Sequence, residues 1–102
     1  MKIIALEREL PGASPDAFQN YSCEEARAAW ELNQAGLIRE LYFRADQPTA
    51  VLVLECASMD AAREIVTGLP LVREGLIAFD LIPLKAYPGF ARLFDASIGE
   101  NS

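Results

Sequence analysis

The chain has 102 residues, 52% of them apolar and 24% charged, with a formal net charge of −6 and no histidine. This length fits one domain, and the acidic balance argues against binding to nucleic acid or to an anionic membrane surface. Without histidine, the commonest general base and the usual haem or zinc ligand are missing, so acid–base chemistry falls to carboxylates, Tyr, Lys or Cys.

The first third of the chain predicts one strand and one helix. Residues 2–10 contain several Ile and Leu residues and are followed by a Pro-Gly break, which predicts a strand. The helix has two candidate starts. A Ser-Pro pair suits the first helical turn, and Ser22 with Glu25 has the form of a capping box. We therefore expect one or two turns near 15–20 and then a helix over about 23–35.

The remaining elements follow at regular intervals. Residues 37–44 and 50–56 predict two strands, which a turn rich in Asp, Gln and Pro joins as a hairpin. Ser58 is expected to cap a second helix over about 59–68, because the apolar residues of that segment lie on one arc. Residues 76–84 predict the last strand.

The predicted order is therefore βαββαβ. Split βαβ units in this order form the ferredoxin-like α+β fold, a four-stranded antiparallel sheet with both helices on one face. The other face is then bare, and a second copy of the sheet would cover it in a dimeric α+β barrel. The high apolar content, and the position of Trp30 on the helix side opposite Leu32, both favour a homo-oligomer, either a dimer or a larger ring.

The chain is expected to form a single domain over residues 1–95, with an aromatic C-terminal tail over 85–95 and disorder over 96–102. No apolar run reaches the roughly 18 residues of a membrane span, and the apolar run at the N-terminus is too short for a signal peptide. Cys23 and Cys56 are accordingly expected to be free thiols in the cytoplasm.

Alternation along the strands gives the candidate site residues. One face of each strand carries ionisable groups, whereas the opposite faces of the third and fourth strands are wholly apolar and suit the helices. The ionisable faces are therefore expected to line the barrel interior, where they would place Glu7, Glu40, Tyr42, Glu55 and Asp80. A β-bulge would invert part of this assignment.

Three of these residues are predicted to be catalytic. Glu55 and Asp80 each follow a run of apolar residues, and a carboxyl group in an apolar cavity has a raised pKa and can move protons near neutral pH. Tyr42 is predicted to donate a hydrogen bond to a developing enolate. The alternative is that such strand-end acids are solvated or paired with neighbouring arginines.

The remaining candidates are predicted to bind substrate. Arg39, Arg44, Arg8 or Lys85 could hold a substrate carboxylate, and Glu7 and Glu40 would complete the site. The sequence has no phosphate-binding loop and no Cys/His metal spacing, so we expect neither a metal nor a cofactor.

The chain resembles the muconolactone delta-isomerases over most of its length. The resemblance rests on Gly-Leu-Pro-Leu after the second helix (68–71), a last strand that ends in Pro-Leu (75–84) and an Xaa-Pro tail (87–88). The hairpin is similar too, at Arg39, Leu41 and Glu55. It implies a ferredoxin-like dimeric α+β barrel, often assembled into larger rings by tail exchange. It also implies a role near the breakdown of aromatic compounds.

Three functions follow as hypotheses. The first is a cofactor-free isomerase or lyase that acts on a small oxygenated or aromatic-derived metabolite. The second is a non-catalytic module for ligand binding or assembly. The third is a cofactor-independent monooxygenase, which only the shape of the fold supports. In the barrel interior, an enclosed cavity with two acids within proton-transfer reach would favour catalysis, and a filled apolar interior would favour assembly.

Overall fold

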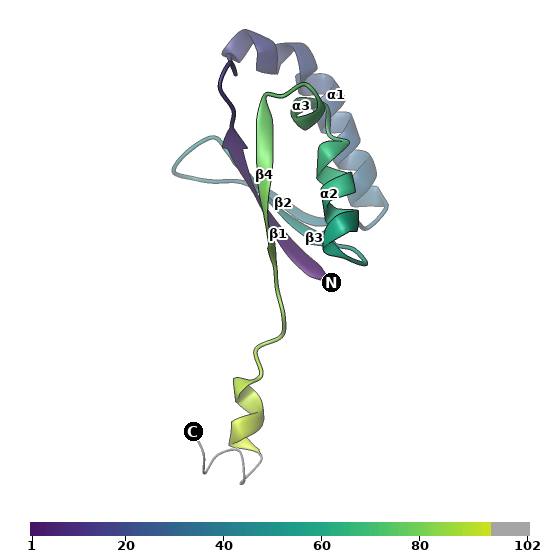
Figure 1. Ribbon diagram of the computed structural model, residues 1–102, viewed down its shortest axis with the longest axis vertical. Coiled ribbons are helices and arrows are strands. Elements are labelled where there is room, and N and C mark those ends of the chain that lie inside the picture. Colours follow the sequence, from purple (N-terminus) through teal and green to yellow (C-terminus); the bar gives the residue numbers. More distant parts are fainter. Residues whose placement is uncertain (95–102) are drawn as a thin grey trace.

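The computed structural model describes residues 1–94 and contains four strands and three α-helices (Figure 1). The predicted disorder of residues 96–102 concerns a segment outside the described residues. In chain order the elements are β1 (Lys2–Glu9), α1 (Pro15–Gln34), β2 (Ile38–Phe43), β3 (Ala50–Glu55), α2 (Met59–Thr67), α3 (Pro70–Arg73), β4 (Ile77–Pro83) and the 3₁₀ helix η1 (Gly89–Leu93).

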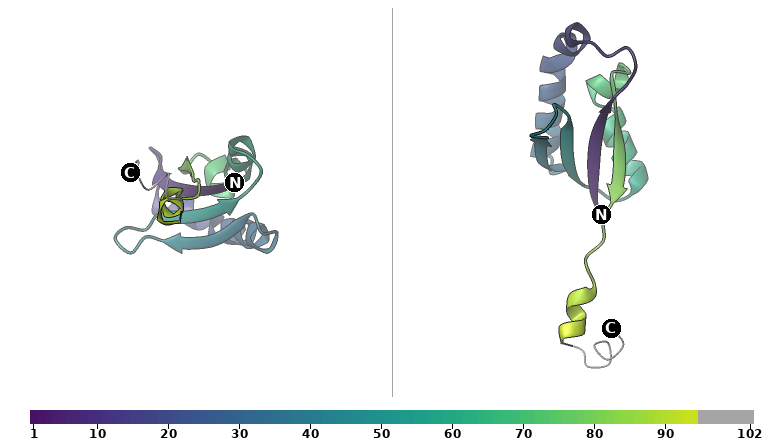
Figure 2. Two further views of the ribbon diagram at one scale, coloured as in Figure 1. Left: turned by 90° about the horizontal axis from the view of Figure 1, so that it is seen from below. Right: turned by 90° about the vertical axis from the view of Figure 1, so that its left-hand side faces the viewer.

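The four strands form one antiparallel sheet in the order β2-β3-β1-β4. This arrangement confirms the predicted α+β fold with a four-stranded antiparallel sheet. All three helices lie on one side of the sheet, and the right-hand view of Figure 2 looks onto the other, open face. No helix within residues 1–94 is both long and apolar enough to cross a membrane.

Helix α1 is one continuous helix, which corrects the predicted break near residue 22. Ser14 caps it, because its Oγ accepts a hydrogen bond from the backbone N–H of Ala17 at 3.2 Å. Ser22 lies inside the helix and donates to the carbonyl of Gln19 instead of acting as a cap. No Gly or Pro follows Pro15 within the helix, so nothing in the sequence interrupts it.

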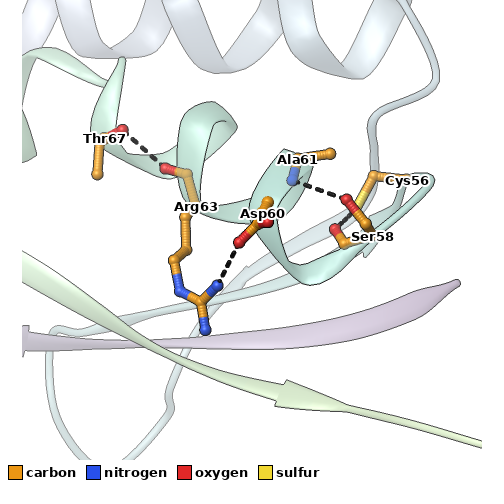
Figure 3. Close-up of polar contacts among 6 residues, drawn as sticks. All are labelled: Cys56, Ser58, Asp60, Ala61, Arg63 and Thr67. Carbon is orange, nitrogen blue, oxygen red and sulfur yellow. Dashed lines mark hydrogen bonds and ion pairs between the residues drawn. The ribbon is translucent and has the colours of Figure 1, made fainter.

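Helix α2 begins at the predicted cap and is followed by a short helix that the sequence did not predict. The Ser58 Oγ accepts a hydrogen bond from the backbone N–H of Ala61 at 3.1 Å, and Arg63 pairs with Asp60 at 2.8 Å (Figure 3). Helix α3 then starts at Pro70, whose fixed φ suits the first helical position.

The register of the sheet decides which side chains face the helices. Ile3 and Ala5 of β1 stand opposite Leu54 and Leu52 of β3, and all four are buried in one core with residues of α2. Glu7 stands opposite Phe79 of β4 and therefore lies on the same, helix-covered side. The predicted position of Glu7 on the open face is wrong. Both faces of β1 carry apolar residues, so alternation alone cannot tell which of them packs against the helices.

A register shift between Ile38 and Glu40 changes the sidedness of β2. Ile38 stands opposite Leu54 on the helix side, whereas Glu40 stands opposite Val53 on the open face. The irregularity therefore inverts the start of β2 relative to simple alternation. Tyr42, which is opposite Val51, also lies on the open face.

The open face and the C-terminal segment leave apolar side chains uncovered in the single chain. Ile82 of β4 is 43% exposed. Beyond β4 the chain leaves the sheet and forms η1, well away from the core (Figure 1). The rings of Tyr87 and Phe90 meet edge to face there, with centroids 5.0 Å apart, and Phe90 is 66% exposed.

Candidate functional site

A cavity of about 500 Å³ lies on the helix-covered side of the sheet, between α1, α3 and the strands. This volume is in the range that holds small organic ligands. Eleven of its fifteen lining residues are apolar, and the polar ones are Glu7, Ser22, Glu25 and Tyr42. Leu41 and Phe43 of β2 line the cavity and are exposed, so we place its mouth at the β2 edge.

Glu7 enters this cavity from β1. Its Oε1 atom accepts a hydrogen bond from the backbone N–H of Ala50 at 3.2 Å, which fixes the carboxyl group against β3. Loss of water around the half-buried side chain raises the pKa of Glu7, and the nearby charges of Glu9 and Glu25 raise it further, against the opposing effect of the Ala50 hydrogen bond.

Glu25 enters the same cavity from α1. It precedes Ala28 and Ala29 by three and four residues, and both of these pack against the core, so Glu25 shares the inward side of the helix. Its Oε1 atom accepts a hydrogen bond from the backbone N–H of Leu71 at 2.9 Å, in the first turn of α3. Burial raises the pKa of Glu25, while the Leu71 hydrogen bond and the charge of Arg73 oppose that rise.

Glu7 and Glu25 line the same cavity from opposite walls, the sheet and α1. Each uses Oε1 for a backbone hydrogen bond, and among residues 1–94 neither Oε2 atom has a hydrogen-bond partner. Burial raises the pKa of both carboxyl groups, and the charge of Glu25 adds to the rise at Glu7. Such a pair can supply both a general acid and a general base.

The predicted catalytic acids lie elsewhere and apart from each other. Asp80 is on the open face, where its Oδ1 atom is 3.1 Å from Arg8 Nε. Glu55 is on the same face, in the strand on the opposite flank of β1. It stands opposite Lys2 of β1, whereas Asp80 stands opposite Leu6, four residues further along β1. Strand geometry places the two acids on the order of 16 Å apart, too far for both to contact one small substrate in one subunit.

Glu55 has one unusual feature of its own. Its Oε2 atom is buried without a hydrogen-bond partner, although the amino group of Met1 lies 3.8 Å away. This ion pair is partly exposed and contributes little to stability. The proposed catalytic roles of Glu55 and Asp80 stay predictions about the open face.

The other predicted residues have local partners. Tyr42 has an open-face position in the register of β2, but it also belongs to the lining of the cavity, which opens at the β2 edge. Its hydroxyl donates to Glu40 at 2.6 Å, and this hydrogen bond raises the pKa of Tyr42. Arg39 donates to the carbonyl of Gly36 at 2.6 Å, at the turn between α1 and β2. Arg44 pairs with Asp46 in the hairpin turn at 2.6 Å. These contacts match the alternative in which strand-end charges pair with their neighbours.

Glu25 is the residue of the cavity that the sequence analysis missed. The capping-box interpretation places its carboxyl group at a helix start, and Glu25 is not among the predicted site residues. The signal that could have found it is its spacing from Ala28, Ala29 and Leu32, which repeats at three, four and seven residues. A carboxylate on the apolar arc of a helix is an unusual feature that indicates a buried site.

The raised pKa values predict a pH dependence of stability. A buried carboxyl group with a raised pKa keeps its proton in the folded state at a pH where the unfolded chain has lost it. The stabilisation that Glu7 and Glu25 contribute should therefore be complete below their ordinary pKa of 4.5 and be lost as pH rises through the folded-state values.

Urea unfolding of the wild type and of the Glu7→Gln, Glu25→Gln double variant between pH 4.5 and 7.5 tests this dependence. The free energy of unfolding should fall with rising pH more steeply in the wild type, because other groups titrate equally in both proteins. Parallel curves would show that the two carboxyl groups titrate as they do in the unfolded chain.

A metal centre has no support in the described part of the chain. Within residues 1–94, no group of three or more His, Cys, Asp and Glu residues is placed as metal ligands would be. Cys23 is exposed and Cys56 is half-buried, and neither forms a disulfide.

Comparison with known proteins gives one family and two similar structures. The family model of muconolactone delta-isomerase matches residues 4–89. The crystal structure of a muconolactone isomerase at 3.3 Å resolution is similar with a TM-score of 0.72 and 21% identity, covering 86% of this chain and 92% of that one. A search of curated proteins found no match.

The second similar structure is a 5-chloro-2-hydroxyhydroquinone dehydrochlorinase from Burkholderia phenoliruptrix AC1100 in complex with 2,5-dihydroxybenzoquinone. It has a TM-score of 0.67 and 17% identity, and the match covers 87% of this chain and 98% of that one. At these identities both structures support the fold rather than a shared substrate.

Proposed function

Because the chain belongs to the muconolactone delta-isomerase family, we propose that it is a cofactor-free enzyme that transfers protons between carbons of a small oxygenated ring compound. The observation that carries this proposal is the pair of half-buried glutamates, Glu7 and Glu25, in one apolar cavity. The family membership supports catalysis on a small molecule, and the cavity indicates where in the chain it would occur.

The proposed reaction is a shift of a carbon–carbon double bond. The ionised carboxylate of the pair takes a proton from a carbon beside the double bond, and the C–H electron pair moves into conjugation with the ring carbonyl. The resulting enolate is then protonated at the far carbon by the protonated carboxyl group. The shift is redox neutral, so it requires no oxidant, and the second carboxyl group stabilises the negative charge by donating a hydrogen bond.

The first step is also compatible with a lyase. Removal of a proton beside a carbonyl begins both a double-bond shift and the loss of chloride from a chlorinated ring, the reaction named for the dehydrochlorinase that shares this fold. The same two glutamates would serve either reaction. Which one occurs depends on whether the substrate carries a leaving group.

Proton NMR in D₂O tests the proposal directly. Unsaturated γ-lactones and chlorinated hydroxyhydroquinones are incubated with the protein, and the expected result is deuterium incorporation at one ring carbon, together with isomerised lactone or released chloride. Binding of these compounds without exchange or conversion would instead support the non-catalytic ligand-binding function.

We further propose that the chain functions as a homo-oligomer in the cytoplasm. Support comes from three uncovered apolar surfaces: the open sheet face, the tail around Phe90, and Trp30, which is 62% exposed on the outer side of α1. Two free cysteines are consistent with a reducing compartment.

A further inference from the structure

Two consecutive glutamates of α1 contact the short helix α3. Glu25 accepts the backbone N–H of Leu71 at 2.9 Å, and Glu24 pairs with the guanidinium of Arg73 at 3.6 Å. Helix α3 has only four residues, so Arg73 lies within one turn of the backbone group that binds Glu25. The charge of Arg73 is therefore placed beside a carboxyl group of the cavity, although Arg73 itself does not line the cavity.

The position of Arg73 is fixed by its own contacts and by the anchoring of α3. Its Nε atom lies 3.4 Å from Glu74, so the guanidinium is held between one acid on α1 and another at the end of α3. Its backbone N–H donates to the carbonyl of Leu69 at 2.9 Å. Leu69 and Pro70 are buried at the start of α3, which ties this helix to the core.

The two carboxyl groups of the cavity have different electrostatic surroundings. Burial raises the pKa of Glu25, and the charge of Arg73 opposes that rise. Burial also raises the pKa of Glu7, and the nearby charges of Glu9 and Glu25 raise it further. The cation thus favours the ionised form of Glu25, and ionised Glu25 in turn favours the protonated form of Glu7.

Arg27 is the other basic residue close to Glu25 in sequence. It lies two positions further along α1, which turns it about 200° around the helix axis. There it lines an outer groove together with Glu24 and Glu31, away from the cavity. Lys2, Lys85 and Arg92 lie on other segments, at the start of β1, after β4 and in η1.

We propose that Arg73 is a positioning residue of the cavity: held between α1 and the end of α3, it keeps Glu25 in the ionised form that takes the proton and leaves Glu7 as the group that donates one. The inference rests on the proposed function and assigns the two roles within it. Arg73 acts through Glu25 and not on the substrate. One turnover leaves Glu25 protonated and Glu7 ionised, and proton exchange with solvent water restores the starting state.

Titration of the glutamate carboxyl groups by NMR tests the inference without a substrate. The full chain is labelled with ¹³C at the Glu Cδ positions, and the signals of Glu7 and Glu25 are assigned by their loss in the corresponding Gln variants. In Arg73→Gln the midpoint of Glu25 should rise by roughly half a pH unit, because the ionised form loses a partly exposed cation. Arg73→Lys keeps the charge and should keep most of the wild-type midpoint. Salt at about 1 M should shrink the difference between wild type and Arg73→Gln.

Two further variants locate the effect. Arg63→Gln is the matched control, because Arg63 pairs with Asp60 on α2 and its loss should leave the Glu25 midpoint in place. Arg27→Gln should shift that midpoint less than Arg73→Gln does. An unchanged midpoint in Arg73→Gln would overturn the inference, as would an equal or larger shift in Arg27→Gln. A wild-type Glu7 that titrates below Glu25 would contradict the assigned roles.

The pH dependence of activity separates this inference from the proposed function. The acid limb of kcat/KM reports the base of the free enzyme. Because a higher pKa delays the ionisation of Glu25, the limb should move to higher pH in Arg73→Gln by the same amount as the midpoint, and it should stay in place in Arg73→Lys. A shifted midpoint without deuterium exchange would retain the role of Arg73 and contradict catalysis. Deuterium exchange with an acid limb that does not move in Arg73→Gln would retain catalysis and contradict the role of Arg73.

Discussion

Replacement of Glu7 by Gln is expected to lower kcat/KM by about 10²- to 10⁴-fold, the range that a general acid or base contributes, and Glu25→Gln should have an effect of similar size. Glutamine keeps the side-chain oxygen that accepts the N–H of Ala50 or of Leu71, so the local structure should survive. Only the ability to exchange a proton is removed. The measurement is kcat/KM for whichever compound shows exchange in D₂O.

Combining the two changes gives a further check on the pair. If the carboxyl groups act as one acid–base unit, the double variant should lose little more activity than the more damaged single variant. Losses that multiply would indicate two independent roles. Circular dichroism and the urea midpoint of each variant show whether the fold is intact, because a misfolded variant would also lose activity.

Matched variants decide which face of the sheet carries the chemistry. Glu55→Gln and Asp80→Asn remove the two acids of the open face, which lie outside the cavity. With the reaction in the cavity, both variants should keep activity within a few-fold of the wild type. A loss above about 10²-fold in either of them, with Glu7→Gln unaffected, would transfer the site to the open face.

The face that each strand turns toward the helices could be predicted for some strands and not for others. In β3 and β4 the apolar face is continuous while the other face carries an acid, so Glu55 and Asp80 were assigned to the open face in agreement with the register. In β1 both faces begin with apolar residues, and only the pairing of Ile3 with Leu54 and of Glu7 with Phe79 reveals that Glu7 enters the helix-covered cavity.

The helices also show that a local sequence pattern predicts only local contacts. The cap at Ser58 was predicted correctly, because a capping residue acts through its immediate neighbours. Ser22 has the same local form, yet it lies in the middle of α1, where helical residues on both sides continue the hydrogen-bond ladder. The cavity depends on contacts distant in sequence, such as Glu25 with Leu71, and a local pattern does not contain them.

The predicted resemblance to the muconolactone delta-isomerases is confirmed, since the family model covers residues 4–89. The motifs that carried the resemblance, such as Gly-Leu-Pro-Leu at 68–71, form a structural feature: Leu69 and Pro70 are buried where α2 gives way to α3. They also help to form the wall of the cavity. The turn that they form places the backbone N–H of Leu71 at 2.9 Å from Glu25.

The substitution Ile82→Asp is expected to convert the proposed homo-oligomer into monomers. Ile82 lies on the open face of β4 and is 43% exposed in the single chain, so the monomer should tolerate the change. In a twofold-symmetric dimer of these faces each substitution occurs twice, and an unpaired carboxylate is buried in each copy. Light scattering should give a mass near 11.2 kDa for the variant and at least twice that for the wild type.

The control and a second variant show which surface holds the subunits together. Asn20→Asp adds the same charge to an exposed position of α1 and should leave the mass unchanged. Phe90→Ala tests the tail, because Phe90 is 66% exposed on η1, which lies well away from the core (Figure 1), and a neighbouring subunit could cover it. If Ile82→Asp kept the wild-type mass while Phe90→Ala lowered it, the tail rather than the open face would hold the subunits together. An unchanged mass in both variants would contradict assembly through either surface.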